Sequence, residues 1–255
     1  SDSSDDTATD DTATDDGTSG WEGPLADFVS EAIAFIEDLR GAPFDARPVV
    51  VALPDVDFIA RVESELEAEF AENPDRVEEA TVAQRAIGFI GPDQTSDEVL
   101  RQFLAAGVLG FYDPETKKLV VRQVSELDLL TKSTIVHELT HAYDDQLFDL
   151  DRPELDDDTL TERSWTFGAL AEGSASHVET AWVETLTATE RSDLRDQEAN
   201  FGDPGMFASF DFAYLLLQVS VYVEGEPYVD ALIAEGGYEA LAVAFTELAL
   251  TSEQI

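Results

Sequence analysis

The run of residues 132–150, KSTIVHELTHAYDDQLFDL, contains the pentapeptide H-E-L-T-H, with histidines at positions 137 and 141. Apolar residues recur through this run at roughly helical spacing, and it contains neither Gly nor Pro, which predicts an α-helix. Positions four apart lie on one face of a helix, so His137 and His141 can both point at a single cation. A fold that uses this pair must bring further ligands to that one face.

The residue between the histidines supplies a possible base. Glu138 lies one position round the helix from His137 and can lean over the same site to take a proton from water. Neutral imidazole is a good zinc ligand, and a zinc site with an open position activates water for hydrolysis. At average composition the pentapeptide arises by chance in under ~1% of chains of this length, and this chain has only three His. Ser133 or Thr134 is expected to cap the helix, and the run from 149 to Pro153 to end it.

A hydrolytic zinc site needs three protein ligands, and the Ala-rich run 165–185 offers two candidates for the third. Glu172 stands between an alanine and a glycine, which let one helix approach another closely. His177 is the rival, but at about 100° per residue the two side chains point about 140° apart on one helix and can hardly bind the same ion. Ser176, one turn after Glu172, is placed to support that ligand. The spacing favours Glu172 and leaves His177 as the less favoured alternative.

These residues resemble the gluzincin group of zinc metallopeptidases, which carry H-E-x-x-H on one helix and a glutamate ligand on the next. More narrowly, the chain is similar to a little-described family of bacterial and archaeal metallopeptidases with a signature like H-E-L-T-H-A-x-x-D-Q followed by A-L-x-E-G-x-A. The matching segments are 137–146 and 169–175, with further similarity at 110–114, 222–225 and 251–255. The resemblance thus covers most of the chain after about residue 80.

The resemblance implies a zincin-like α+β fold and a role for each motif residue. His137, His141 and Glu172 are expected to bind one zinc ion, and Glu138 to act as general base and acid. The chain departs from the pattern at Ser174, where the resemblance leads us to expect an acidic residue.

Gluzincins usually add a tyrosine or histidine that stabilises the oxyanion of the tetrahedral intermediate. No histidine follows His177, so a tyrosine is expected. Tyr222 matches a family-like Y-x-x-G pattern and is the predicted catalytic donor, while Tyr143 and Tyr228 are weaker alternatives. The competing interpretation of Tyr222 is a core tyrosine with a hydrogen-bonded hydroxyl.

The charge balance constrains the partners of this chain. It has 56 Asp and Glu against 14 Lys and Arg, a formal net charge of −42. Acidic residues run from end to end, which favours adaptation to high salt over a nucleic-acid mimic or a cation buffer, because salt screens the self-repulsion. Such a charge argues against nucleic acids and anionic membrane surfaces as partners and favours a peptide or protein substrate.

The first twenty residues have a different composition from the rest. Residues 1–20 contain seven Asp, no basic residue and the repeat D-D-T-A-T, which predicts a disordered acidic tail. Acidic tethers of this kind are common on cell-surface proteins of salt-loving microbes, so an extracytoplasmic location is expected. The chain has no cysteine, and it has no 18-residue apolar stretch that would predict a membrane span.

Residues 21–255 predict a single helix-rich α+β domain. A short strand is expected at 47–53, and a β-hairpin just before the motif helix, with strands at 107–112 and 118–122. The segment 110–112 is a candidate edge for binding a peptide as an added strand, although a plain structural hairpin is an equal alternative. Helices are expected at 21–39, 55–72, 78–90 and 96–106, and again after Glu172 to the end, with breaks at 202–205, 225–227 and 236–237.

Three functional hypotheses follow. The leading one is a zinc-dependent peptidase in which Glu138 activates water. The alternative is a catalytically silent zinc-binding surface module that holds peptides, against which the retained Glu138 argues. A third, weaker hypothesis is zinc-dependent hydrolysis of a non-peptide substrate. The sequence carries no signal for the oligomeric state.

Overall fold

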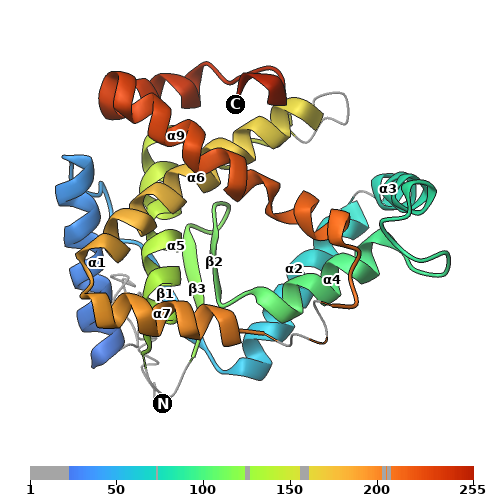
Figure 1. Cartoon of the computed structure of the whole chain (residues 1–255), viewed down its shortest axis with the longest axis horizontal. Helices are drawn as coiled ribbons and strands as arrows, with labels where there is room; N and C mark the ends of the chain where they lie inside the picture. Colours follow the sequence, from blue (N-terminus) through green and yellow to red (C-terminus); the bar gives the residue numbers. More distant parts are fainter. Residues whose placement is uncertain (1–22, 73, 124–126, 156–160, 203–204, 206–207) are drawn as a thin grey trace, which may run out of the picture.

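The computed structural model describes residues 23–255 except 73, 124–126, 156–160, 203–204 and 206–207, so the predicted tail lies outside the described residues. The chain is helix-rich with one small sheet, as expected for an α+β protein (Figure 1). The elements are α1 (Pro24–Arg40), β1 (Val49–Leu53), α2 (Asp55–Glu72), α3 (Pro74–Ile87), α4 (Ser96–Gly107), β2 (Gly110–Asp113), β3 (Lys118–Arg122), α5 (Leu129–Phe148), α6 (Thr161–Thr185), α7 (Ala188–Asn200) and α9 (Phe212–Thr246), with 3-10 turns at Pro153–Leu155 and Ser252–Gln254.

The sheet has three strands in the order β1-β3-β2. β1 runs parallel to β3, and β2 pairs antiparallel with β3, which confirms the predicted hairpin. β2 has β3 as its one neighbour in this sheet. In an antiparallel pair, the backbone groups of every second residue point toward the partner strand and those of the residues between point away from it. Arg122 N–H of β3 donates to the carbonyl of Leu109, so the backbone groups of Gly110 and Tyr112 point away from β3. Of these groups, the Tyr112 N–H donates to Glu138 of the motif helix at 2.8 Å.

Helices cover the two faces of the sheet. Leu119 and Val121 of β3 are buried in one cluster with Leu139 of α5 and residues of α1. Phe111 of β2 faces the other way and packs against Phe58 of α2, with ring centroids 5.9 Å apart. The motif helix α5 therefore lies against one face of the sheet and α2 against the other.

The motif helix begins earlier than its sequence predicted. Its cap is Asp128, whose carboxylate accepts from Thr131 N–H at 2.9 Å, rather than Ser133 or Thr134. The Ser133 hydroxyl instead donates to Glu179 at 2.6 Å, and the Thr134 hydroxyl donates to the carbonyl of Leu130 at 3.0 Å. Asp128 competes better for the cap because its charge also interacts favourably with the helix dipole. The expected helix at 78–90 starts at Pro74 and ends at Ile87, where Gly88 adopts a positive φ of 82°.

α6 and α9 cross in close contact (Figure 1). A Cβ atom on Gly173 would lie under 3.0 Å from the backbone of Gly225, so two glycines form the crossing point. The predicted break at 225–227 is wrong, because α9 continues through Pro227. Pro227 lies on the exposed side of α9, where water can reach the carbonyl that loses its helical partner, while buried Val229 holds the helix against its neighbours. The predicted break at 236–237 is present as a kink, with a φ of 67° at Gly237.

None of the described helices is both long and apolar enough to cross a membrane.

Candidate metal centre

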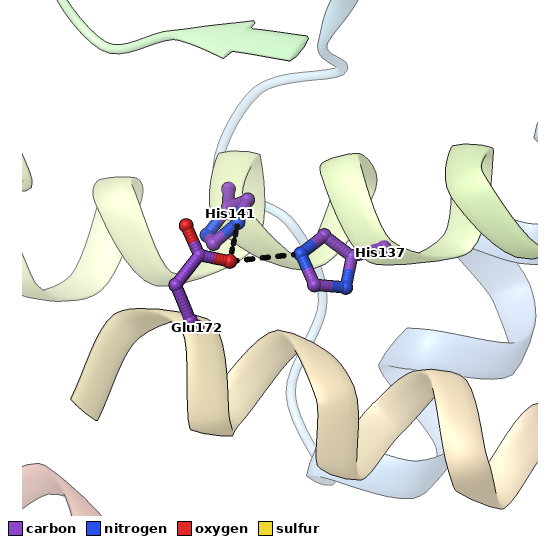
Figure 2. Close-up of side chains that lie close together, drawn as sticks. All are labelled: His137, His141 and Glu172. Carbon is purple, nitrogen blue, oxygen red and sulfur yellow. Dashed lines mark hydrogen bonds and ion pairs between the residues drawn. The ribbon is translucent and has the colours of Figure 1, made fainter. Parts of the chain in front are cut away.

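Two histidines of α5 meet a glutamate of α6. His137 and His141 project from one face of α5 with ring centroids 4.9 Å apart. Oε2 of Glu172 lies 3.0 Å from Nε2 of His137 and 3.3 Å from Nε2 of His141. Figure 2 shows the three side chains converging between the two helices. The structure thus brings together the three residues predicted as ligands, with their ligand atoms all within 4.8 Å of one another.

Helix packing sets this geometry. The opposite face of α5 is fully buried through Ile135 and Leu139, which leaves the histidine face toward α6. The two helices run antiparallel, because Glu172 contacts His141 whereas Glu179, two turns later in α6, contacts residues earlier in α5. Side chains of α6 two turns apart therefore reach successive turns of the motif helix.

The charges of the three residues influence one another. Burial favours neutral imidazole, but hydrogen bonds to Glu172 and Glu179 raise the pKa of His137 well above its ordinary value of 6.5. Burial acts in the same way on His141, yet the charge of Glu172 raises its pKa too. The two rings in turn hold the pKa of the Glu172 carboxyl well below its usual range despite its burial. The site thus favours positive charge.

The donor set suits a divalent transition metal. Two imidazole nitrogens and one carboxylate oxygen are ligands that catalytic zinc sites use, with a fourth position left for water or substrate. A metal ion would replace the protons that otherwise neutralise Glu172 between His137 and His141. These three residues can hold one metal ion.

Glu179 is a site residue that the sequence did not reveal. Its Oε2 lies 3.0 Å from Nδ1 of His137, and its Oε1 accepts from the Ser133 hydroxyl at 2.6 Å. A proton shared with Glu179 on Nδ1 leaves Nε2 of His137 free to bind a metal. The available signal was the seven-residue spacing from Glu172, which places the two carboxylates on one face of α6, two turns apart.

The candidate base is held by the edge strand. Glu138 Oε2 accepts from the backbone N–H of Tyr112 in β2 at 2.8 Å. Burial raises the pKa of Glu138 above its ordinary value of 4.5, although the nearby His141 and His137 act in the opposite direction. A carboxylate with a raised pKa is a better general base.

Of the three tyrosines considered, the structure brings Tyr222 to the metal centre. Its ring centroid lies 6.0 Å from that of His137. The residue is 42% exposed as a whole, but burial of its hydroxyl, together with the charges of Glu172 and Glu138, raises the pKa of Tyr222. The Tyr143 hydroxyl donates to the carbonyl of Ala42 at 3.1 Å in the core. Tyr228 packs in a separate apolar cluster with Leu170 and Phe245.

The rival ligand lies apart from the three ligand residues. Nδ1 of His177 is 2.6 Å from Oδ1 of Asp230, and its Nε2 is 3.3 Å from the Tyr238 hydroxyl. His177 thus faces α9 while Glu172 faces α5, as the angle between them predicted.

Neighbours of Glu172 have roles different from those predicted. Ser176 lines a cavity, and the residue that supports a ligand is Glu179 rather than Ser176. Ser174 donates to Oδ2 of Asp144 at 2.5 Å and accepts from Nη1 of Arg40 at 3.2 Å. An acidic side chain at this position would lie beside the Asp144 carboxylate, so serine suits the contact.

A cavity of about 340 Å³ adjoins the metal centre between α6, α7 and α9. It shares Glu179 with the site, and Ser176 on its wall lies one turn after Glu172. Glu226 and Arg195 line its other sides. The metal centre therefore lies next to an open space with room for a side chain.

No family model, no curated protein and no solved structure matches this chain.

Proposed function

We propose that this chain is a zinc-dependent peptidase of gluzincin type, with a zincin-like fold. The observation that carries the proposal is the convergence of His137, His141 and Glu172 with Glu138 beside them. A metal site that served only stability would have no use for a half-buried carboxylate next to its ligands, held by one hydrogen bond from the edge strand. Water attack on a carbonyl does require such a base.

Zinc fits the donor set best among common metals. His137, His141 and Glu172 supply nitrogen and oxygen ligands in a partly buried setting, and Glu179 orients the first of them. When bound, zinc would supply a Lewis acid that polarises the substrate carbonyl and increases the acidity of water.

The side chains of this protein would perform the proton transfers. Glu138 takes a proton from the attacking water and passes it to the leaving amine. Tyr222, kept protonated by its raised pKa, donates a hydrogen bond to the oxyanion that forms at the carbonyl.

The edge strand β2 is the proposed binding surface for the peptide backbone. The backbone groups of Gly110 and the carbonyl of Tyr112 point away from β3 and would pair with the peptide, while the Tyr112 N–H stays on Glu138. A peptide added along this edge would pass beside the base, because Tyr112 of this strand contacts Glu138.

The composition of the chain supports a salt-rich, extracytoplasmic setting. The net charge of −42 supports a protein that works at high salt. The acidic composition of residues 1–20 supports an extracytoplasmic location, with that segment as a tether.

The test combines metal analysis with catalysis. We expect one zinc per chain by mass spectrometry or atomic emission, and cleavage of casein or a quenched peptide in molar KCl. Glu138→Gln should keep the metal and lose activity by roughly 10²-fold or more, since a positioned base contributes 10²–10⁴-fold. Glu67→Gln, at an exposed glutamate of α2 on the other side of the sheet from α5, serves as the matched control and should leave both properties unchanged.

The competing function is a silent zinc-binding module. Bound zinc without cleavage of any peptide in a broad library would reject the peptidase proposal and support this alternative. Cleavage that survives Glu138→Gln would instead reject the role assigned to Glu138.

A further inference from the structure

Three polar residues lie three to five positions after His141, the second histidine ligand. Each of them contacts a different segment of the chain. Asp144 forms a buried ion pair with Arg40 of α1, at 2.7 Å. Gln146 Oε1 accepts from the backbone N–H of Asp45 at 2.8 Å. Asp145 binds the β-hairpin. Of these three, Asp145 leads back to the proposed catalytic base.

The Asp145 carboxylate is buried, with 1% of its side chain exposed, and its oxygens accept from several donors. The Tyr112 hydroxyl donates to Oδ2 at 2.6 Å, and the Leu150 N–H donates to Oδ1 at 2.9 Å. Nζ of Lys117 lies 3.0 Å from Oδ1 and 2.9 Å from Oδ2. A buried carboxylate held by three donors has little freedom to move, so it is a rigid anchor for the tyrosine.

One residue of β2 connects this anchor to the base. The hydroxyl of Tyr112 binds Asp145, and the backbone N–H of the same residue binds Oε2 of Glu138 at 2.8 Å. Glu138 and Asp145 are seven residues apart in α5, which places them on the same face two turns apart. Tyr112 lies along this face and contacts both carboxylates.

We infer that Asp145 and Tyr112 together position the Glu138 carboxylate, with Tyr112 joining the buried anchor to the base. This inference rests on the proposed function, because it assigns positioning residues to that reaction. The hydrogen bond from Tyr112 holds Oε2 of Glu138 and leaves Oε1 to exchange protons with water and the leaving amine. The same contact sets the distance between β2 and α5, and hence the position of a peptide along the edge.

Two substitutions separate this role from simple stabilisation. Tyr112→Phe removes the hydroxyl but keeps the ring and the backbone N–H, and Asp145→Asn keeps the shape of the anchor but removes its charge. Tyr143→Phe is the matched control, because it removes a hydroxyl bonded to Ala42 in the core, away from Glu138. If Asp145→Asn fails to fold, Tyr112→Phe still decides the question.

The first readout is hydrogen exchange of the residue 112 amide, measured by NMR in the zinc-loaded protein at molar KCl. We expect Tyr112→Phe to speed this exchange at least tenfold relative to neighbouring β2 amides, and Tyr143→Phe to leave it unchanged. Loss of stability alone would speed exchange across the whole hairpin rather than at this amide.

The second readout is kinetic. Tyr112→Phe should lower kcat by roughly 10- to 100-fold, as expected for a misplaced catalytic group, with KM within about twofold and one zinc per chain retained. Unchanged amide exchange and unchanged kcat in Tyr112→Phe would overturn the inference. A wild-type protein that binds zinc but cleaves nothing would reject the proposed function, and amide exchange would then still decide whether Asp145 and Tyr112 hold Glu138.

Discussion

Gly173 of α6 and Gly225 of α9 lie backbone against backbone, so that a Cβ atom on either would come under 3.0 Å from the other helix. This crossing lies beside the metal centre, because Glu172 immediately precedes Gly173 and Tyr222 precedes Gly225 by three residues. The two helices can therefore bring a ligand and a proposed oxyanion donor together from segments about fifty residues apart in the chain. Their close approach depends on the absence of side chains at the two glycines.

The glycine crossing predicts a sharp steric effect. Gly225→Ala should lower the free energy of unfolding by about 1–3 kcal/mol or more, because the added methyl group overlaps backbone that cannot move aside. Gly168→Ala is the control, since its Cβ would meet Val221 at an ordinary 3.6 Å. That change should stabilise the helix by about 0.5–1 kcal/mol. Urea unfolding in molar KCl measures both, and equal effects of the two changes would contradict the crossing.

Glu179→Gln should weaken metal binding. The amide can no longer hold the proton on Nδ1 of His137 as a carboxylate does, so we expect a roughly 10- to 100-fold lower zinc affinity in competition with a chelating dye. The control is Glu184→Gln, five residues later in α6, which should not change the zinc affinity. An unaltered affinity in Glu179→Gln would show that His137 does not need this partner.

Tyr222→Phe tests the proposed oxyanion donor. Loss of the Tyr222 hydroxyl should reduce kcat by about 10²-fold, because this group acts only when charge develops on the substrate carbonyl. Zinc content and KM should stay close to those of the wild type. Tyr228→Phe provides the control from the same helix, in a separate apolar cluster. Equal kcat values for wild type and Tyr222→Phe would assign Tyr222 to packing.

The hairpin turn should contribute stability that depends on pH. Burial opposes ionisation of Asp113, but hydrogen bonds from Thr116 and Glu115 and the charge of Arg61 hold the pKa of Asp113 below its ordinary value of 3.8. A depressed folded-state pKa stabilises the fold above 3.8 and loses this effect as the pH falls through the folded value. Asp113→Asn should thus cost about 1 kcal/mol at neutral pH. The difference from wild type should shrink in acid, and a difference independent of pH would contradict this account.

Salt should raise the melting temperature strongly. With a net charge of −42, repulsion between carboxylates destabilises the folded chain at low ionic strength, and salt screens it. Thermal unfolding followed by circular dichroism should show a steady rise in Tm from 0.1 to 3 M KCl. Over this series the Debye length falls from about 10 Å to below 3 Å. A flat profile would exclude adaptation to high salt.

Local patterns in the sequence were sufficient to predict the helix that carries the two histidines, the hairpin before them and the preference for Glu172 over His177. Each depends on the chemistry of nearby residues or on the 3.6-residue helical period, which hold whatever the fold. The sequence predicted the wrong cap for α5, because Asp128 competes with Ser133 and Thr134 for this role. It also predicted a break at 225–227, whereas α9 continues through Pro227 because an exposed face tolerates a missing hydrogen bond.

The partners of the histidines and of the base depended on tertiary structure. Glu179 reaches His137, and the Tyr112 N–H reaches Glu138, only because antiparallel packing of α6 and the edge position of β2 place them there. Such contacts join residues 26 to 42 positions apart, and no local period encodes them. The motif therefore specifies a pair of ligands, whereas the packing of α6, α9 and β2 around α5 makes that pair a site that can bind a metal and hold a base beside it.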